Sequence, residues 1–177
     1  MTSYIALLRG VNVGGRAKIA MADLRAVLTG LGCGDVRTLL QSGNAVFTAP
    51  EVDPAELEST IEAALAAELG LTTRCLIRTG DEMRAVVAAN PLADIADNGS
   101  KFAIAFLATE PDPALAAEHD PVTVDPDNIR VGDRVIYQWC PDGLSKPPFL
   151  GPFLERKWKI AATVRNWNTT TKLAAMA

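Results

Sequence analysis

The sequence predicts an α+β protein, because short apolar runs of strand length alternate with segments whose apolar residues recur at helical spacing. Residues 1–78 follow the order strand, helix, strand, strand, helix, strand, whereas residues 79–177 mix strands and helices with longer loops. The junction at Arg78-Thr79 has no linker composition. We therefore expect a regular subdomain over 1–78 and a second α/β subdomain with a C-terminal helical segment over 79–177, packed as one compact unit.

The elements of the first half follow from its apolar spacing and its turn residues. Tyr4–Leu8 is apolar on both faces, as in a central strand. Asp53-Pro54 supplies the N-cap and first residue of a helix, and Ser42-Gly43-Asn44 supplies a hairpin turn. The expected elements are the strands 4–8, 36–41, 45–48 and 73–78 and the helices 21–31 and 53–69. Their order is that of the ferredoxin-like split βαβ arrangement.

The second half is less regular, and no internal sequence repeat is evident in it. A capping box at Thr79-Gly80-Asp81-Glu82 begins a helix, and a hairpin turns at Gly132-Asp133. A loop rich in proline and glycine covers 141–152. The expected elements are the helices 79–89, 112–119, 153–159 and 163–176 and the strands 101–107, 129–131 and 135–139.

Composition excludes several classes of protein and of site. The chain has 177 residues, 49% hydrophobic and 21% charged, which excludes disordered, collagen-like and disulfide-framework proteins. His119 is the one histidine, so sites that need two histidines are excluded, and we expect no metal and no cofactor. Three scattered cysteines without an export signal favour a cytoplasmic location. No apolar run approaches a membrane span, so we expect no membrane partner.

The net charge of −4 is an average over three unlike segments. Residues 1–48 carry five basic and two acidic side chains, a local charge of +3. Residues 49–143 carry six basic and eighteen acidic side chains, a local charge of −12. Residues 144–177 carry six basic and one acidic side chain, a local charge of +5. Because local charge attracts a ligand, the two ends of the sequence favour an anionic one.

The ferredoxin-like order places the loop 9–20 and the turn 41–44 at one edge of the sheet, where ligands commonly bind. Glycines in this loop permit a concave nest of backbone N–H groups for an anion, or alternatively only satisfy backbone geometry. The loop matches neither a Walker A nor a G-x-G-x-x-G motif. The candidate ligand-binding residues at this edge are Arg9, Asn12, Gly14, Gly15, Arg16, Lys18, Gln41, Ser42 and Asn44.

The expected last helix carries a polar face, because Arg165, Asn168, Thr169 and Lys172 are spaced at i, i+3, i+4 and i+7. These groups suit phosphate or carboxylate, although the face is equally consistent with plain solvation. The candidate residues here are Arg165, Asn166, Asn168, Thr169 and Lys172.

Trp158 stands within a basic run over 156–159. A basic run with an aromatic residue can bind nucleic acid by phosphate contact and stacking, whereas such a tryptophan is more commonly buried in the core. Ser42 lacks a neighbouring histidine, and His119 lies at a helix end, so no catalytic residue is assigned.

Three segments stand out together, ALLRGVNVGG (6–15), LQSGNAVF (40–47) and ATVRNWNT (162–169). In this order and spacing they resemble the bacterial domain-of-unknown-function family numbered 1697, over essentially the whole chain. The resemblance implies a cytoplasmic, single-chain α/β protein with a ferredoxin-like first half and no assigned activity. It also implies the hallmark positions Arg9, Gly10, Asn12, Gly14, Gly15, Gln41, Ser42, Gly43, Asn44, Arg165, Asn166, Trp167, Asn168 and Thr169.

The leading functional hypothesis is that the first loop, the turn and the last helix form one basic, amide-rich cleft for a phosphate- or carboxylate-bearing small molecule. One alternative is nucleic-acid binding through the basic N- and C-terminal segments. Another is an enzyme that works without a histidine base. A third is a purely structural role for the hallmark polar residues. The sequence leaves the ligand, the reaction, the oligomeric state and the cellular process open.

Overall fold

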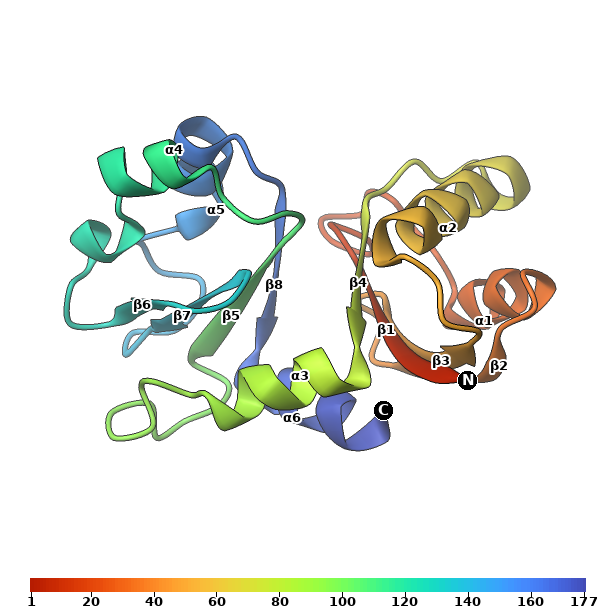
Figure 1. Cartoon of the computed structure of the whole chain (residues 1–177), viewed down its shortest axis with the longest axis horizontal. Coiled ribbons are helices and arrows are strands. Elements are labelled where there is room, and N and C mark those ends of the chain that lie inside the picture. The colour runs from red at the N-terminus through yellow and green to blue at the C-terminus, as the bar shows by residue number, and fades with distance from the viewer. The chain divides into compact units, whose positions relative to one another are not determined.

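The computed structural model describes residues 1–177 and comprises two compact units (Figure 1). Unit 1 consists of Met1–Arg84 together with Leu173–Ala177, and unit 2 consists of Ala85–Lys172. Each unit contains one four-stranded antiparallel sheet with helices, so the α+β class is confirmed. That 1–78 and 79–177 pack as one compact unit stays a prediction.

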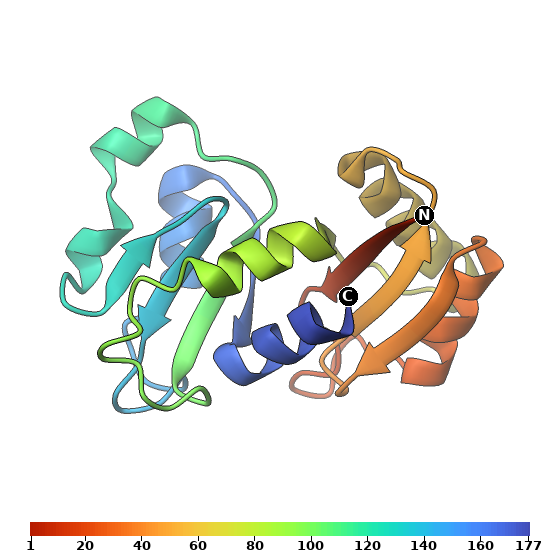
Figure 2. The same ribbon diagram turned by 60° about the horizontal axis from the view of Figure 1, so that its bottom comes forward.

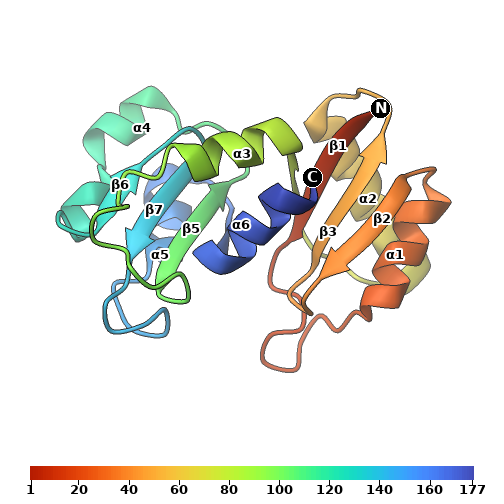
Figure 3. The same ribbon diagram turned by 90° about the horizontal axis from the view of Figure 1, so that it is seen from below.

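Unit 1 has the ferredoxin-like order that the sequence predicts. Its elements are β1 (Thr2–Leu8), α1 (Met21–Gly30), β2 (Gly34–Leu39), β3 (Asn44–Ala49), α2 (Pro54–Leu69), β4 (Cys75–Thr79) and the first part of α3 (Gly80–Ala88). The sheet order is β2-β3-β1-β4, and every neighbouring pair is antiparallel. Figure 3 shows α1 and α2 on the same face of this sheet. The loop between β1 and α1 extends beyond the end of the strands in the same view.

The core of unit 1 lies between the sheet and these two helices. Tyr4 of β1, Phe47 of β3 and Ile77 of β4 point to this face and are at most 1% exposed. Leu28 of α1 and Ile61 of α2 pack against them. Alternate residues of each strand therefore form the core, as the pleat requires.

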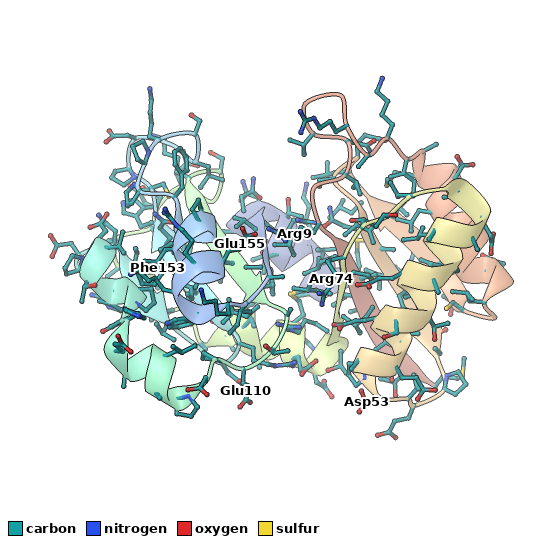
Figure 4. The ribbon with its side chains drawn as sticks, turned by 90° about the horizontal axis from the view of Figure 1, so that it is seen from above. Arg9, Asp53, Arg74, Glu110, Phe153 and Glu155 are labelled. Carbon is teal, nitrogen blue, oxygen red and sulfur yellow. The ribbon has the colours of Figure 1, made fainter.

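Local sequence signals set the ends of the helices. Asp53, labelled at one end of α2 in Figure 4, accepts a hydrogen bond from the Ala55 N–H at 2.8 Å and caps this helix. The predicted capping box before α3 is also confirmed. The Thr79 N–H donates to Glu82 Oε2 at 2.8 Å, and the Glu82 N–H donates to Thr79 Oγ1 at 3.1 Å.

Unit 2 repeats the topology of unit 1, which the sequence does not reveal. Its elements are β5 (Phe102–Leu107), α4 (Pro113–Glu118), the 3₁₀ turn η1 (Pro121–Val124), β6 (Ile129–Val131), β7 (Val135–Trp139), α5 (Leu150–Phe153), the π-helical turn η2 (Leu154–Trp158), β8 (Ala162–Asn166) and most of α6 (Trp167–Met176). The sheet order β6-β7-β5-β8 is again second, third, first and fourth strand. Figure 2 shows the helical segments between these strands on one face of the sheet.

The repeat is hidden because its connecting helices are short. α4 has 6 residues and α5 has 4, whereas α1 has 10 and α2 has 16. The prediction of one basic helix over 153–159 is corrected in its bounds and its type. A regular turn, α5, precedes it, and Leu154–Trp158 forms a π-helical turn.

The predicted last helix over 163–176 is wrong at its beginning. Thr163 and Val164 are β-branched and pair with β5, so this stretch forms β8, and α6 begins at Trp167. Arg165 is therefore a strand residue and does not share a helix face with Lys172. None of the helices is both long and apolar enough to span a bilayer. No three His, Cys, Asp or Glu side chains are grouped as metal ligands.

Candidate functional site

The loop after β1 folds into a small hairpin. The Asn12 N–H donates to the Ala17 carbonyl, and the Arg16 N–H donates to the Val13 carbonyl, both at 3.2 Å. Gly14-Gly15 forms the tip with φ angles of 60° and 73°. Two left-handed central residues define a type I′ turn, which glycine adopts without strain. The glycines thus have a role in backbone geometry, and a nest that binds an anion stays a prediction.

The side chain of Asn12 fastens this hairpin to the turn between β2 and β3. Its Nδ2 donates to the Gln41 carbonyl at 2.6 Å and to the Ile19 carbonyl at 2.9 Å. Its Oδ1 accepts the Ile19 N–H at 2.9 Å. The loop and the turn therefore meet at one sheet edge, as the sequence predicts, and Asn12 serves to position them.

The turn between β2 and β3 is packed too tightly for any residue but glycine at Gly43. Its φ is 81°, and a Cβ there would lie 2.6 Å from Val11 Cγ2 and 2.7 Å from Leu8 Cβ. Asn44 is fully buried, and its Nδ2 donates to Ser42 Oγ at 2.8 Å and to the Leu39 carbonyl at 2.9 Å. Ser42 and Asn44 therefore help to build the turn.

An open depression of about 500 Å³ lies beside the hairpin, at the beginning of α1. It is lined by Asn12, Gly15, Lys18, Ile19, Ala20, Asp23 and Leu69. Ala20 is the N-cap of α1 and gives its first turn no side-chain hydrogen bond. The first N–H groups of a helix have no intrahelical partner, and they carry partial positive charge. Lys18 and the beginning of α1 thus bring positive charge to this depression.

Asp23 brings a negative charge to the same depression and was not among the residues expected there. Its position in the first turn of α1 is typical of an acidic residue that stabilises a helix, so the sequence does not distinguish it as part of a site. Asp23 partly offsets Lys18, so the depression is not uniformly basic.

Arg9 belongs to the junction of β1 with the beginning of β4. Its N–H donates to the Arg74 carbonyl at 2.9 Å, and its own carbonyl accepts Thr73 Oγ1 at 2.7 Å. Figure 4 labels Arg9 and Arg74 at this junction. Arg74 Nε donates to Glu62 of α2 at 3.1 Å.

The candidate residues near the C-terminus belong to unit 2. Arg165 is 8% exposed, and its Nη1 donates to Thr163 Oγ1 at 2.8 Å and to the Val164 carbonyl at 3.0 Å. Burial lowers the pKa of Arg165 to about 10. The Arg165 side chain is thus almost enclosed within unit 2, and its role in ligand binding stays a prediction. One cleft made by this set and the loop of unit 1 stays a prediction.

The residues after Arg165 organise the beginning of α6. Asn166 Oδ1 accepts the Thr169 N–H at 2.9 Å, which is an N-cap hydrogen bond. Thr169 is 6% exposed, and the exposed Asn168 lies against the backbone of Gly99. Lys172 is exposed. Of these residues, Asn168 and Lys172 have the side chains most open to solvent.

Trp158 is a core residue of unit 2. It is the last residue of η2, is 3% exposed and packs in the hydrophobic core of unit 2. Its Nε1 donates to the His119 carbonyl at 2.8 Å. A nucleotide base has no access to such a ring for stacking. Arg156, Lys157 and Lys159 around it are exposed.

Comparison with known proteins gives a family but no activity. The model of a family described as protein of unknown function (DUF1697) matches residues 1–137. No curated protein matches the chain significantly. Among solved structures, the conserved bacterial protein SP0830 from Streptococcus pneumoniae is 25% identical, with a TM-score of 0.78. That match covers 99% of this chain and 98% of the other, so it includes residues of both units.

Proposed function

We propose that this chain, which belongs to the DUF1697 family of proteins of unknown function, binds a small molecule through a phosphate or carboxylate group. The binding site is the depression between the hairpin and α1. The observation that carries the proposal is that Lys18 lines an open depression together with Ala20 and Asp23, at the positively polarised beginning of α1.

The charges at this site suit an anionic group. Lys18 supplies an ammonium, and the beginning of α1 adds the partial positive charge of the helix dipole. Arg16 on the hairpin is exposed and adds a second positive charge nearby in sequence. The volume of about 500 Å³ lies within the range of about 300–1,000 Å³ that small-molecule sites occupy.

The hairpin is held by hydrogen bonds within the protein. Asn12 holds it by three hydrogen bonds to Ile19 and Gln41, and the type I′ turn fixes its tip. A loop whose backbone is held by its own hydrogen bonds loses less conformational entropy on binding than a free loop does. This supports binding by the free protein without a folding step.

Asp23 restricts the ligand class. Its carboxylate repels an anion but accepts hydrogen bonds, so the ligand's acidic group faces Lys18 and a hydroxyl or amino group faces Asp23. A phosphorylated or carboxylated metabolite that also carries a hydroxyl or amine meets both demands. Inorganic anions lack that second group and therefore bind more weakly.

Calorimetric titration with inorganic pyrophosphate at low ionic strength tests the proposal, with two opposite expectations. Lys18→Ala lowers the affinity about 5- to 10-fold, and Asp23→Asn raises it, because one removes attraction and the other repulsion. Lys157→Ala removes the same charge from an exposed position of unit 2 and serves as the matched control. Equal losses in Lys18→Ala and Lys157→Ala would show that net charge alone attracts the anion, and would reject this site.

The alternatives predict different outcomes in parallel titrations. Nucleic-acid binding predicts that the chain retains a short single-stranded oligonucleotide and that this retention decreases steeply as salt is added. It also predicts a larger loss of retention in Lys157→Ala than in Lys18→Ala. Catalysis without a histidine base predicts turnover that is lost in Arg9→Ala at unchanged melting temperature. A purely structural role predicts that no anion raises the melting temperature of the wild type.

A further inference from the structure

The strand registers make the two units comparable residue by residue. Ile5 of β1 pairs with Arg78 of β4, and Ile104 of β5 pairs with Arg165 of β8. Both arginines are the fourth residue of the last strand of their unit, and both are buried. Ile5 therefore corresponds to Ile104, and the neighbours of each isoleucine correspond as well.

The residue before Ile5 in β1 is Tyr4, which belongs to a pair of aromatic residues. Tyr4 and Phe47 lie directly opposite each other in β1 and β3. Their rings are stacked with centroids 5.9 Å apart, and both are at most 1% exposed. At the equivalent positions of unit 2, Ala103 lies directly opposite Gln138. Unit 2 thus has a methyl group and an amide where unit 1 buries two aromatic rings.

A cavity of about 280 Å³ occupies this place in unit 2. Its walls include Ala103 and Ala105 of β5, Gln138 of β7, Val164 of β8 and Leu150 of α5. None of the lining side chains is charged. The 4-residue α5 and the 5-residue η2 cover this face where unit 1 has the 16-residue α2, so neither the sheet nor the shorter helical segment fills the space.

We propose that this cavity binds a small, neutral aromatic molecule of one or two rings that donates a hydrogen bond to Gln138. The space corresponds to that of stacked rings, which favours a planar ligand. The uncharged walls exclude an anion, because a charge buried there would have no counter-charge. The volume is slightly below the usual range of about 300–1,000 Å³, which limits the ligand to the size of a phenol or an indole.

Gln138 sets the polar requirement of the ligand. Its Nε2 donates to the Pro148 carbonyl at 2.8 Å, which fixes the orientation of the amide. Gln138 is 7% exposed and lines the cavity, so its Oε1 is the acceptor that a ligand hydroxyl or N–H can use. A hydrocarbon of the same shape lacks this donor and would cover the Gln138 oxygen without a hydrogen bond.

Titration of the full chain with indole and with indene, its isosteric hydrocarbon, tests the proposal. Wild type prefers indole by about 5- to 10-fold, and Gln138→Leu abolishes that preference, because one buried hydrogen bond is lost. Ala103→Phe restores the aromatic ring of unit 1 and abolishes the binding of both probes. Ala117→Phe, the same substitution at an exposed position of α4, leaves binding unchanged.

Cys140 provides a readout that needs no core substitution. Its side chain lines the cavity and is half-buried, whereas Cys33 and Cys75 are buried in unit 1. Saturating indole slows the reaction of Cys140 with a thiol reagent at least about 5-fold, because the ligand covers the sulfur. Unchanged labelling in the presence of indole, or wild-type binding by a folded Ala103→Phe, would overturn the proposal.

Discussion

Arg78 and Arg165 occupy the same position in the two units of the chain. Each pairs with an isoleucine of its central strand, and each donates an Nη1 hydrogen bond to the carbonyl of the residue before it, at 2.9 and 3.0 Å. Each is followed by a residue whose side chain caps the next helix, Thr79 in unit 1 and Asn166 in unit 2. The two units thus agree in detail at the junction of last strand and helix, although their sequences show no repeat.

The cap of α6 is expected to contribute measurably to stability. Asn166→Ala removes the acceptor of the Thr169 N–H and lowers the free energy of unfolding by about 1 kcal/mol. Asn168→Ala, two residues further on at an exposed position, changes it by less than about 0.5 kcal/mol. Urea unfolding of both variants measures the difference. Equal losses would show that Asn166 does not act as the cap.

Gly43 is expected to be far less tolerant of a side chain than Gly70. Both have a positive φ, but a Cβ at Gly43 would meet Val11 and Leu8, whereas at Gly70 nothing lies within 4 Å. Gly70→Ala costs about 1 kcal/mol of backbone strain, and Gly43→Ala costs at least about 2 kcal/mol more. Thermal unfolding of the two variants compares them. A similar decrease in Tm for both would contradict the tight packing of this turn.

Titration of Tyr137 is expected to lower the stability of the protein as the pH rises above about 10. Burial raises its pKa to about 12, and its hydroxyl donates to the Val86 carbonyl at 2.7 Å. Its contribution is complete below the pKa of the unfolded chain, about 10, and is lost as the pH rises through about 12. Tyr137→Phe therefore lowers the free energy of unfolding by about 1 kcal/mol near pH 8.

The difference between Tyr137→Phe and wild type then narrows as the pH rises, because only the wild type loses the hydroxyl proton. Urea unfolding at about pH 8 and about pH 10.5 measures this change. If the difference in the free energy of unfolding between the two proteins is the same at both pH values, Tyr137 does not titrate in this range and the prediction is wrong.

Unit 1 is largely predictable from sequence, because α1 and α2 are long and explicit signals mark the hairpin turn and the beginnings of α2 and α3. The Asp53 cap, the Thr79–Glu82 capping box and the hairpin turn before Asn44 are all confirmed. These signals are local, so they can be recognised without knowledge of the tertiary contacts. Their spacing suffices to fix the order of strands and the sheet edge at which loop and turn meet.

Unit 2 is less predictable, because its topology rests on tertiary contacts. The helical spacing of Arg165 with the polar residues after it predicts a helix, but Arg165 pairs with β5 and lies in a strand. The cavity depends on Ala103 lying opposite Gln138, which requires the strand register. Asp23 and the beginning of α1 are part of the candidate site because the hairpin folds beside them. The spacing of charged residues in the sequence does not predict this fold.

The most direct test of the proposed anion site is the map of backbone amide shifts when the ¹⁵N-labelled chain is titrated with inorganic pyrophosphate. We expect the largest shifts at Gly15, Lys18 and Asp23, in the loop after β1 and in the first turn of α1, and their loss in Lys18→Ala. Shifts spread evenly over the exposed lysines and arginines of both units, or centred on the beginning of α6, would contradict a site at this depression.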